Sequence, residues 1–124
     1  MRVKSSVSSK YLSLTFPLTT VSEPNRRDHW GKRRRRGANQ QQVVGWELAA
    51  FRPSIAAVGL PVRVTLTRIA PERTDPDNLG AGFKAVQDAV AKVLNVDDGD
   101  PRVTWVYDQE HQPRGRSVRI EFES

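Results

Sequence analysis

The distribution of apolar residues along the chain first predicts strands. Three ranges alternate apolar with polar or small residues: Tyr11–Leu18, Leu60–Ala70 and Ser117–Glu123. Alternation with a period of two is typical of a half-buried strand. Arg102–Asp108 is a fourth predicted strand, expected to form an antiparallel hairpin with Ser117–Glu123 through a turn between them. Pro17 lacks a backbone N–H, so it marks a sheet edge or a strand end.

A second pattern has a helical period. Apolar residues recur along one face of Leu79–Leu94, which is the spacing of an amphipathic helix. The side chain of Asp77 or Asn78 is expected to cap its first turn, and two glycines weaken that turn. The stripe consists of Leu79, Phe83, Val86, Val90, Val93 and Leu94.

Asn39–Arg52 is predicted to form another helix, with Val43, Trp46 and Ala50 on one face. Pro53 should end it, because the residue before a proline is disfavoured in the α region. The small residues from Ser54 to Gly59 are then expected to form a linker.

These elements predict an α+β protein with a small mixed sheet of about four strands and two helices, in the order β-α-β-α-β-β. The chain has 124 residues, which indicates one domain. We expect residues 1–10 to be a disordered lead-in and residues 11–124 to form that domain. The first ten residues have no signal-peptide pattern, and the sequence has no apolar run long enough to span a membrane. A cytoplasmic location is expected.

Charge narrows the classes of partner. The chain carries 20 Lys+Arg against 14 Asp+Glu and contains no cysteine, which excludes disulfides, thiolate metal sites and cysteine nucleophiles. A net charge of +6 favours an anionic partner. Seven cations fall between Arg26 and Arg36 with Trp30 among them, a pattern that suits phosphate contact and stacking on a base, although a solvated charge run is the alternative. The predicted DNA-binding residues are Arg26, Arg27, Trp30, Lys32, Arg33, Arg34, Arg35 and Arg36.

Acidic residues gather elsewhere, against this basic trend. Asp75 and Asp77 follow the second strand, and Asp97, Asp98 and Asp100 follow the helix. On extended backbone, residues two apart project to the same side, so the first pair is expected to converge on a cation. Carboxylate oxygens suit Mg²⁺, which keeps several waters for a phosphate. The alternative is that Asp-Pro-Asp-Asn is only a turn with a helix cap.

Asp97, Asp98 and Asp100 follow the helix and are expected to lie away from Asp75 and Asp77. The helix carries the chain to the far end of the sheet, so the loop containing Gly99 must bend back if one of them is to complete the site. Asp88 is expected to lie on the helix surface and pair with Lys84 four residues earlier.

Together these residues resemble the RusA family of Holliday junction resolvases. The resemblance rests on Asp75-Pro-Asp77-Asn-Leu79, on Lys84-x-x-x-Asp88-Ala-Val and on the Asp97-Asp98 pair before a strand, and it covers about a quarter of the chain. The basic segment is similar to that of phage-type and prophage-type members. One departure is that Gly80–Phe83 separates Leu79 from Lys84, three residues more than in the shortest members.

The resemblance implies a homodimeric endonuclease that nicks four-way DNA junctions symmetrically and depends on Mg²⁺, with Mn²⁺ as a possible substitute. It implies metal ligands at Asp75, Asp77 and Asp98 and a functional lysine at Lys84. It further implies a role in DNA recombination and repair, for a bacterial or phage-encoded protein associated with the nucleoid. Two other readings stay open: a non-catalytic DNA-binding module, and a nuclease that prefers flaps or replication forks.

Overall fold

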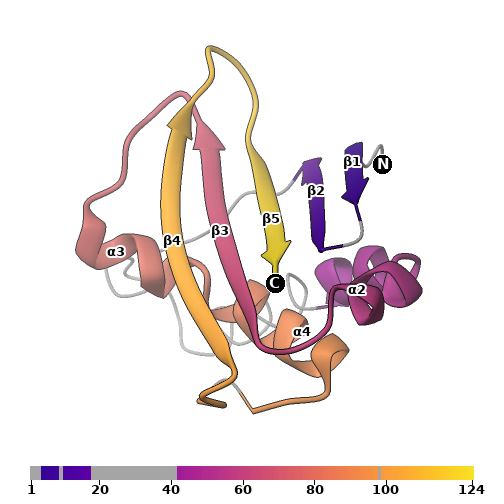
Figure 1. Ribbon diagram of the computed structural model, residues 1–124. Coiled ribbons are helices and arrows are strands. Elements are labelled where there is room, and N and C mark those ends of the chain that lie inside the picture. Colours follow the sequence, from indigo (N-terminus) through magenta and orange to yellow (C-terminus); the bar gives the residue numbers. More distant parts are fainter. Residues whose placement is uncertain (1–3, 9, 18–41, 98) are drawn as a thin grey trace.

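The computed structural model of the protein describes residues 4–8, 10–17, 42–97 and 99–124. Their strands form one five-stranded sheet in the order β1-β2-β5-β3-β4 (Figure 1). Neighbouring strands are antiparallel, except that β3 and β4 are parallel. The strands are β1 (Lys4–Ser8), β2 (Tyr11–Pro17), β3 (Val62–Ala70), β4 (Val103–His111) and β5 (Ser117–Glu123).

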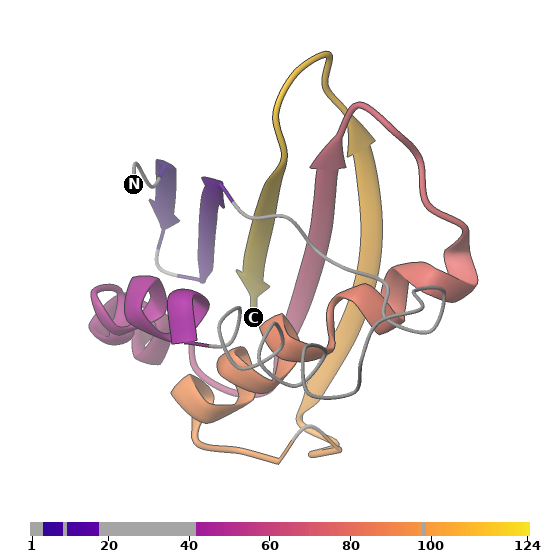
Figure 2. The ribbon, with the colours of Figure 1, turned by 180° about the vertical axis from the view of Figure 1, so that it is seen from behind.

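Helices pack against one face of this sheet, as Figure 2 shows from behind. Residues 42–49 are helical. They are followed by α2 (Arg52–Val58), α3 (Pro76–Gly82) and α4 (Lys84–Leu94). The segment α3–α4 connects β3 to β4, which is the crossover that a parallel strand pair requires.

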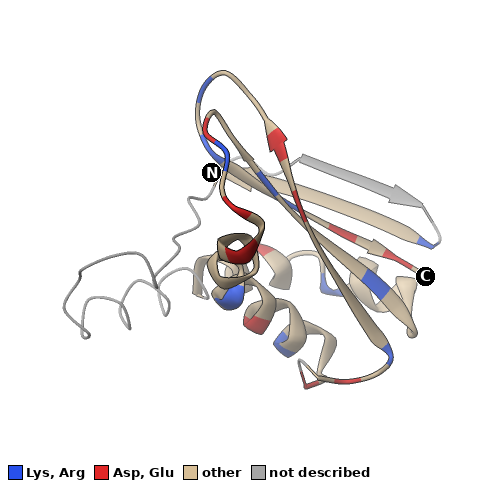
Figure 3. Ribbon diagram, turned by 90° about the vertical axis from the view of Figure 1, so that its left-hand side faces the viewer, with Lys and Arg blue, Asp and Glu red and all other residues tan. Residues whose placement is uncertain are grey.

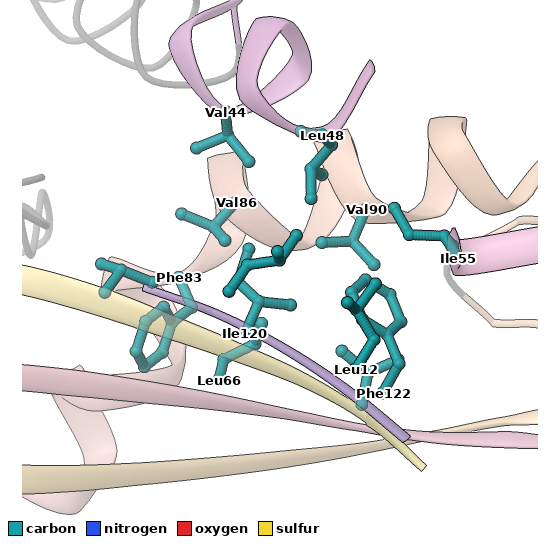
Figure 4. Packing of buried hydrophobic residues seen from close by; sticks show 14 of the residues in the cluster. Leu12, Val44, Leu48, Ile55, Leu66, Phe83, Val86, Val90, Ile120 and Phe122 are labelled. Carbon is teal, nitrogen blue, oxygen red and sulfur yellow. The ribbon is translucent and has the colours of Figure 1, made fainter. Parts of the chain in front are cut away.

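The hydrophobic core lies between the sheet and these helices (Figure 4). The alternating residues of the three expected strands supply its sheet side, and Val86 and Val90 of α4 face them without solvent exposure. The predicted stripe from Leu79 to Leu94, which runs over α3 and α4, is confirmed, because its remaining members are buried or packed against the core. The strand side comprises Leu12, Leu14, Phe16, Val62, Val64, Leu66, Val103, Val118, Ile120 and Phe122.

The coarse prediction of an α+β class with a mixed sheet is confirmed, but both element counts were too low. Residues 4–8 were predicted to be disordered, and instead they form β1, which pairs with β2 from Lys4↔Thr15 to Ser8↔Tyr11. This pairing removes β2 from the sheet edge, so Pro17 marks a strand end. The Ser-rich sequence of β1 has little apolar alternation, and for that reason the pattern did not reveal it.

The predicted linker after Pro53 was also wrong, because this segment is α2. Pro53 lies at the start of α2, where a proline has no hydrogen bond to lose and its backbone angle already suits a helix. Ile55 and Val58 of α2 are buried. The preceding helix buries Val44 and Leu48, whereas Trp46, predicted to lie on its packed face, is 74% exposed.

The predicted helix over Leu79–Leu94 is two helices. It begins earlier, at Pro76, and breaks at Phe83, whose backbone angles are φ −94 and ψ 0. Asp75 occupies the N-cap position without a side-chain capping bond, so the prediction that Asp77 or Asn78 caps the helix was wrong. The two glycines of α3 have low helix propensity, which agrees with the break directly after Gly82.

The predicted β4–β5 hairpin was wrong as well. β3 lies between these strands, parallel to β4 and antiparallel to β5. Burial gives the physical reason: β5 alternates strictly along its length, which suits an internal strand, whereas β4 is mainly exposed, which suits an edge. Within the described residues, no helix is long and apolar enough to cross a membrane.

Candidate functional site

Asp75 and Asp77 lie at the start of α3, after the loop that follows β3; Figure 3 shows acidic ribbon on this part of the chain. Both residues are exposed. The carbonyl oxygen of Asp75 accepts hydrogen bonds from the backbone N–H groups of Asn78 (2.9 Å) and Leu79 (3.0 Å). Its side chain takes no part in capping, so the cap interpretation does not account for the carboxylate.

Asp77 belongs to the first turn of α3. The expectation that it projects from extended backbone on the same side as Asp75 was therefore wrong. An acid in a first turn also has a structural benefit, because it complements the positive end of the helix dipole. That benefit explains the presence of Asp77 but not the exposed pair.

The loop before Asp75 is tied to the sheet by arginines. Nε and Nη2 of Arg116 donate to the two carboxylate oxygens of Glu72 over 2.7 and 2.9 Å. Nη1 of Arg68 donates to the Glu72 carbonyl over 2.6 Å. The hydrogen bonds from Arg116 hold the pKa of Glu72 below its usual value. These contacts fix the loop on its β3–β5 side.

A glutamine fixes the same loop on its β4 side. The Thr74 N–H donates to Oε1 of Gln109 over 3.0 Å, and Nε2 of Gln109 donates to the Thr74 carbonyl over 2.8 Å. Both bonds are partly buried. Because one amide uses its donor and its acceptor on one residue, this contact sets both the position and the orientation of the backbone next to Asp75.

Tyr107 of β4 contacts residues on both sides of the break between α3 and α4. Its hydroxyl donates to Oε1 of Gln87 over 2.6 Å, and its ring stacks on Phe83 with centroids 6.1 Å apart. Gly80 also faces this ring. The contacts hold both helices, and hence the acidic turn, against the edge strand.

Lys84 is the first residue of α4, and its side chain is 72% exposed. Its Nζ lies 3.6 Å from Oδ1 of Asp88, so the predicted surface pair is confirmed. Lys84 follows the helix break directly, which places it close along the chain to the acidic turn but on a separate helix.

The second acidic group lies at the other end of the sheet. Thr74 contacts Gln109, whereas Asp100 precedes Val103, the first residue of β4. Six strand residues correspond to about 20 Å. Figure 3 shows the two acidic segments at separate places. Asp98 lies outside the described residues, and among those described no three carboxylate or histidine side chains are grouped to hold a metal ion.

Asp100 already has a partner. Its carboxylate accepts bonds from Nε (3.1 Å), Nη2 (2.8 Å) and the backbone N–H (2.9 Å) of Arg102. The side-chain bonds from Arg102 are the main reason that the pKa of Asp100 falls from 3.8 to about 2. Asp100 therefore belongs to the turn before β4. It also lines a shallow hollow of about 410 Å³, together with Lys92, Asn95, Val96 and Asp97.

We predict that Arg102→Gln returns the pKa of Asp100 toward 3.8 from about 2, because the guanidinium bonds are lost. A lowered carboxyl pKa means that the pair stabilises the fold above about pH 4 and loses this effect as the pH falls toward 2. Carbon-detected NMR titration of the carboxyl group measures the shift. Equal midpoints in the two proteins would contradict it.

The predicted DNA-binding residues between Arg26 and Arg36 lie outside the described residues. Sequence reasoning missed three residues that position the acidic turn: Tyr107, Gln109 and Arg116. One signal was available for Gln109, since it follows Val103, Trp105 and Tyr107 in steps of two and is the one polar residue in that series. Its target, a backbone group 35 positions away, had no signal in the sequence.

Comparison with known proteins leaves the family open. No family model and no curated protein matches the sequence. A 2C-methyl-D-erythritol-2,4-cyclodiphosphate synthase structure is 14% identical, covers 59% of this chain and 48% of its own, and has a TM-score of 0.35. Thiamine monophosphate kinase from Aquifex aeolicus is 16% identical, with 98% and 37% coverage and a TM-score of 0.34. The chain thus spans less than half of either protein, and likenesses this weak carry no argument about fold or function.

Proposed function

We propose that this protein is a Mg²⁺-dependent endodeoxyribonuclease that resolves four-way DNA junctions by paired symmetric nicks, as its resemblance to the RusA family implies. The observation that carries the proposal is the exposed Asp75–Asp77 pair, whose first carboxylate is not used as a helix cap. The surrounding loop is anchored on both sides.

The two exposed carboxylates fit a hard cation that keeps part of its water shell. Asp75 and Asp77 would hold Mg²⁺ or Mn²⁺. Asp98, the third ligand that the resemblance implies, lies outside the described residues, and its neighbours along the chain lie at the other end of the sheet. A bound ion supplies Lewis acidity at the phosphate and an activated water. Lys84, whose side chain is 72% exposed beside Asp88, would place its positive charge against a non-bridging phosphate oxygen.

The proposal includes a homodimer, because two opposed nicks of matched polarity require two sites related by a dyad. β4 ends the sheet formed by the described strands, so it offers an edge for a second copy. Antiparallel pairing of two β4 strands would set the Asp75 end of one chain beside the Asp97 end of the other. Sedimentation should then give twice the chain mass of 14.0 kDa; a single-chain mass on DNA would contradict the dimer.

A cleavage assay on matched substrates tests the proposed function. The protein is incubated with Mg²⁺ and an end-labelled immobile junction, a flap, a fork and a linear duplex of the same sequence. We expect paired nicks at symmetric positions in the junction alone. Binding without cleavage would support the non-catalytic module, and equal cutting of flap or fork DNA would support a nuclease of another preference.

The basic run gives a second prediction. Changing Arg33, Arg34 and Arg35 to glutamine removes three positive charges and should weaken junction binding. If all three meet phosphates, the slope of log K against log salt should become shallower by roughly 0.9 for each lost contact. Fluorescence anisotropy at several salt concentrations measures it. An unchanged slope would exclude this segment from the DNA interface. Other residues would then have to contact the DNA.

A further inference from the structure

The Gln109 side chain joins the residue before the acidic turn to the edge strand through two hydrogen bonds with the Thr74 backbone. Gln109 lies opposite Arg68 in the register of β3 and β4. The Arg68 side chain holds the Glu72 carbonyl, two residues before Thr74. The neighbouring side chains of Arg68 and Gln109 therefore hydrogen-bond the same loop, at Glu72 and at Thr74.

From this geometry we propose that Gln109 is a positioning residue for the Asp75 and Asp77 carboxylates. The inference rests on the proposed function for its effect on cleavage. The two side-chain hydrogen bonds of Gln109 go to the Thr74 backbone, which is covalently joined to Asp75, so Gln109 acts on the carboxylates through that backbone. Rotation of that backbone would carry the Asp75 side chain with it, and Asp75 also accepts the first backbone bonds of α3.

The contact is specific for a glutamine amide. It needs an acceptor for the Thr74 N–H and a donor for the Thr74 carbonyl on one planar group. Leucine is shorter by one bond and has neither function, and glutamate keeps only the acceptor at neutral pH. The Asp108 carboxylate accepts the backbone N–H of Gln109 over 2.8 Å, so the backbone of Gln109 is itself tied.

Gln112 provides a matched control. Its side chain donates to the Arg114 carbonyl over 2.8 Å within the turn after β4. Its contact with the end of β3 uses its backbone N–H and the Ala70 carbonyl, which a side-chain substitution leaves in place. Gln112→Leu therefore removes a glutamine amide near the same sheet end without releasing Thr74.

The experiment compares Gln109→Leu, Gln109→Glu and Gln112→Leu with the unchanged protein in three measurements. The first is hydrogen exchange of the Thr74 amide by NMR, with thermal melting to establish that each variant folds. The second is the Mg²⁺ concentration that half-saturates the carboxyl shifts of Asp75 and Asp77. The third is the kcat and KM of junction cleavage.

We expect Gln109→Leu to speed Thr74 exchange at least tenfold and to raise the Mg²⁺ midpoint several-fold. The kcat should fall by about tenfold to hundredfold with KM for the junction unchanged, because small displacements of catalytic groups have effects of this size. Gln109→Glu should fall between Gln109→Leu and the unchanged protein, and Gln112→Leu should match the latter. Gln109→Glu keeps the test open if the leucine variant does not fold.

Two results would overturn the inference. One is unchanged Thr74 exchange, and the other is faster exchange with an unchanged Mg²⁺ midpoint. If the unchanged protein binds Mg²⁺ at Asp75 and Asp77 but does not cut junctions, the proposed function fails while the midpoint still decides the role of Gln109. If it neither binds the ion nor cuts, both are wrong.

Discussion

Asp77→Asn is expected to abolish junction cleavage while leaving junction binding intact or tighter. The change removes one of two exposed carboxylates that would hold the cation, and it also removes a negative charge near the DNA phosphates. Loss of partners that only support a metal ligand typically lowers affinity or activity by about 10–100-fold. Loss of a ligand itself should therefore lower kcat by more than about 100-fold. Single-turnover cleavage and gel-shift titration measure the two effects.

Asp108→Asn is the matched control for this substitution. Asp108 is exposed on β4, and its Oδ1 accepts the Gln109 N–H, a role that the asparagine oxygen can keep. This variant should cut junctions at the unchanged rate. If instead Asp77→Asn lost its fold in a thermal melt, Asp77 would be a structural residue of α3, and the reading of this turn as a metal site would lose its main support.

Phe83→Ala is expected to destabilise the protein by about 3–5 kcal/mol, the usual range for removing a buried phenylalanine. Phe83 has no solvent exposure, and it lies at the break between α3 and α4 against the Tyr107 ring. Its loss leaves a cavity and removes the ring contact with Tyr107, while Gln109 still holds Thr74. Urea unfolding followed by circular dichroism measures the change in the free energy of unfolding.

Trp46→Ala tests whether the stability cost of removing an aromatic side chain follows its burial. Trp46 is larger than Phe83 but 74% exposed, so its removal should change stability by no more than about 0.5 kcal/mol. A large loss at Trp46 and a small one at Phe83 would contradict the described packing. The comparison is informative because periodicity alone placed both residues on packed faces.

Periodicity predicted those elements that have one buried face. The strands Tyr11–Pro17, Val62–Ala70 and Ser117–Glu123 agree closely with the alternation, and the α4 stripe is buried as expected. The pattern works there because each element makes its own contact with a single core. It failed for β1, whose sequence has little alternation, and for α2, because Pro53 lies at the start of a helix and not after the end of one.

For the candidate site residues as well, local sequence predicted some features and not others. Their identity followed from local sequence: two acids at a strand exit, a lysine–aspartate pair on a helix, and a basic run. The surface pair Lys84–Asp88 is confirmed. The site assignments of Asp75, Asp77, Asp98 and Lys84 stay predictions, as do Mg²⁺, DNA and the homodimer. Asp100 belongs to an ion pair with Arg102.

By itself, the sequence determined the α+β class, the three alternating strands, the amphipathic helix and the concentration of acids in a basic chain, because each depends on neighbouring residues. Only the tertiary structure decided that β3 separates β4 from β5 and that the acidic segments lie at opposite ends of the sheet. It also decided that Gln109 holds the backbone of Thr74. These features depend on which distant segments pair, and pairing is set by the packing of the whole sheet rather than by any local pattern.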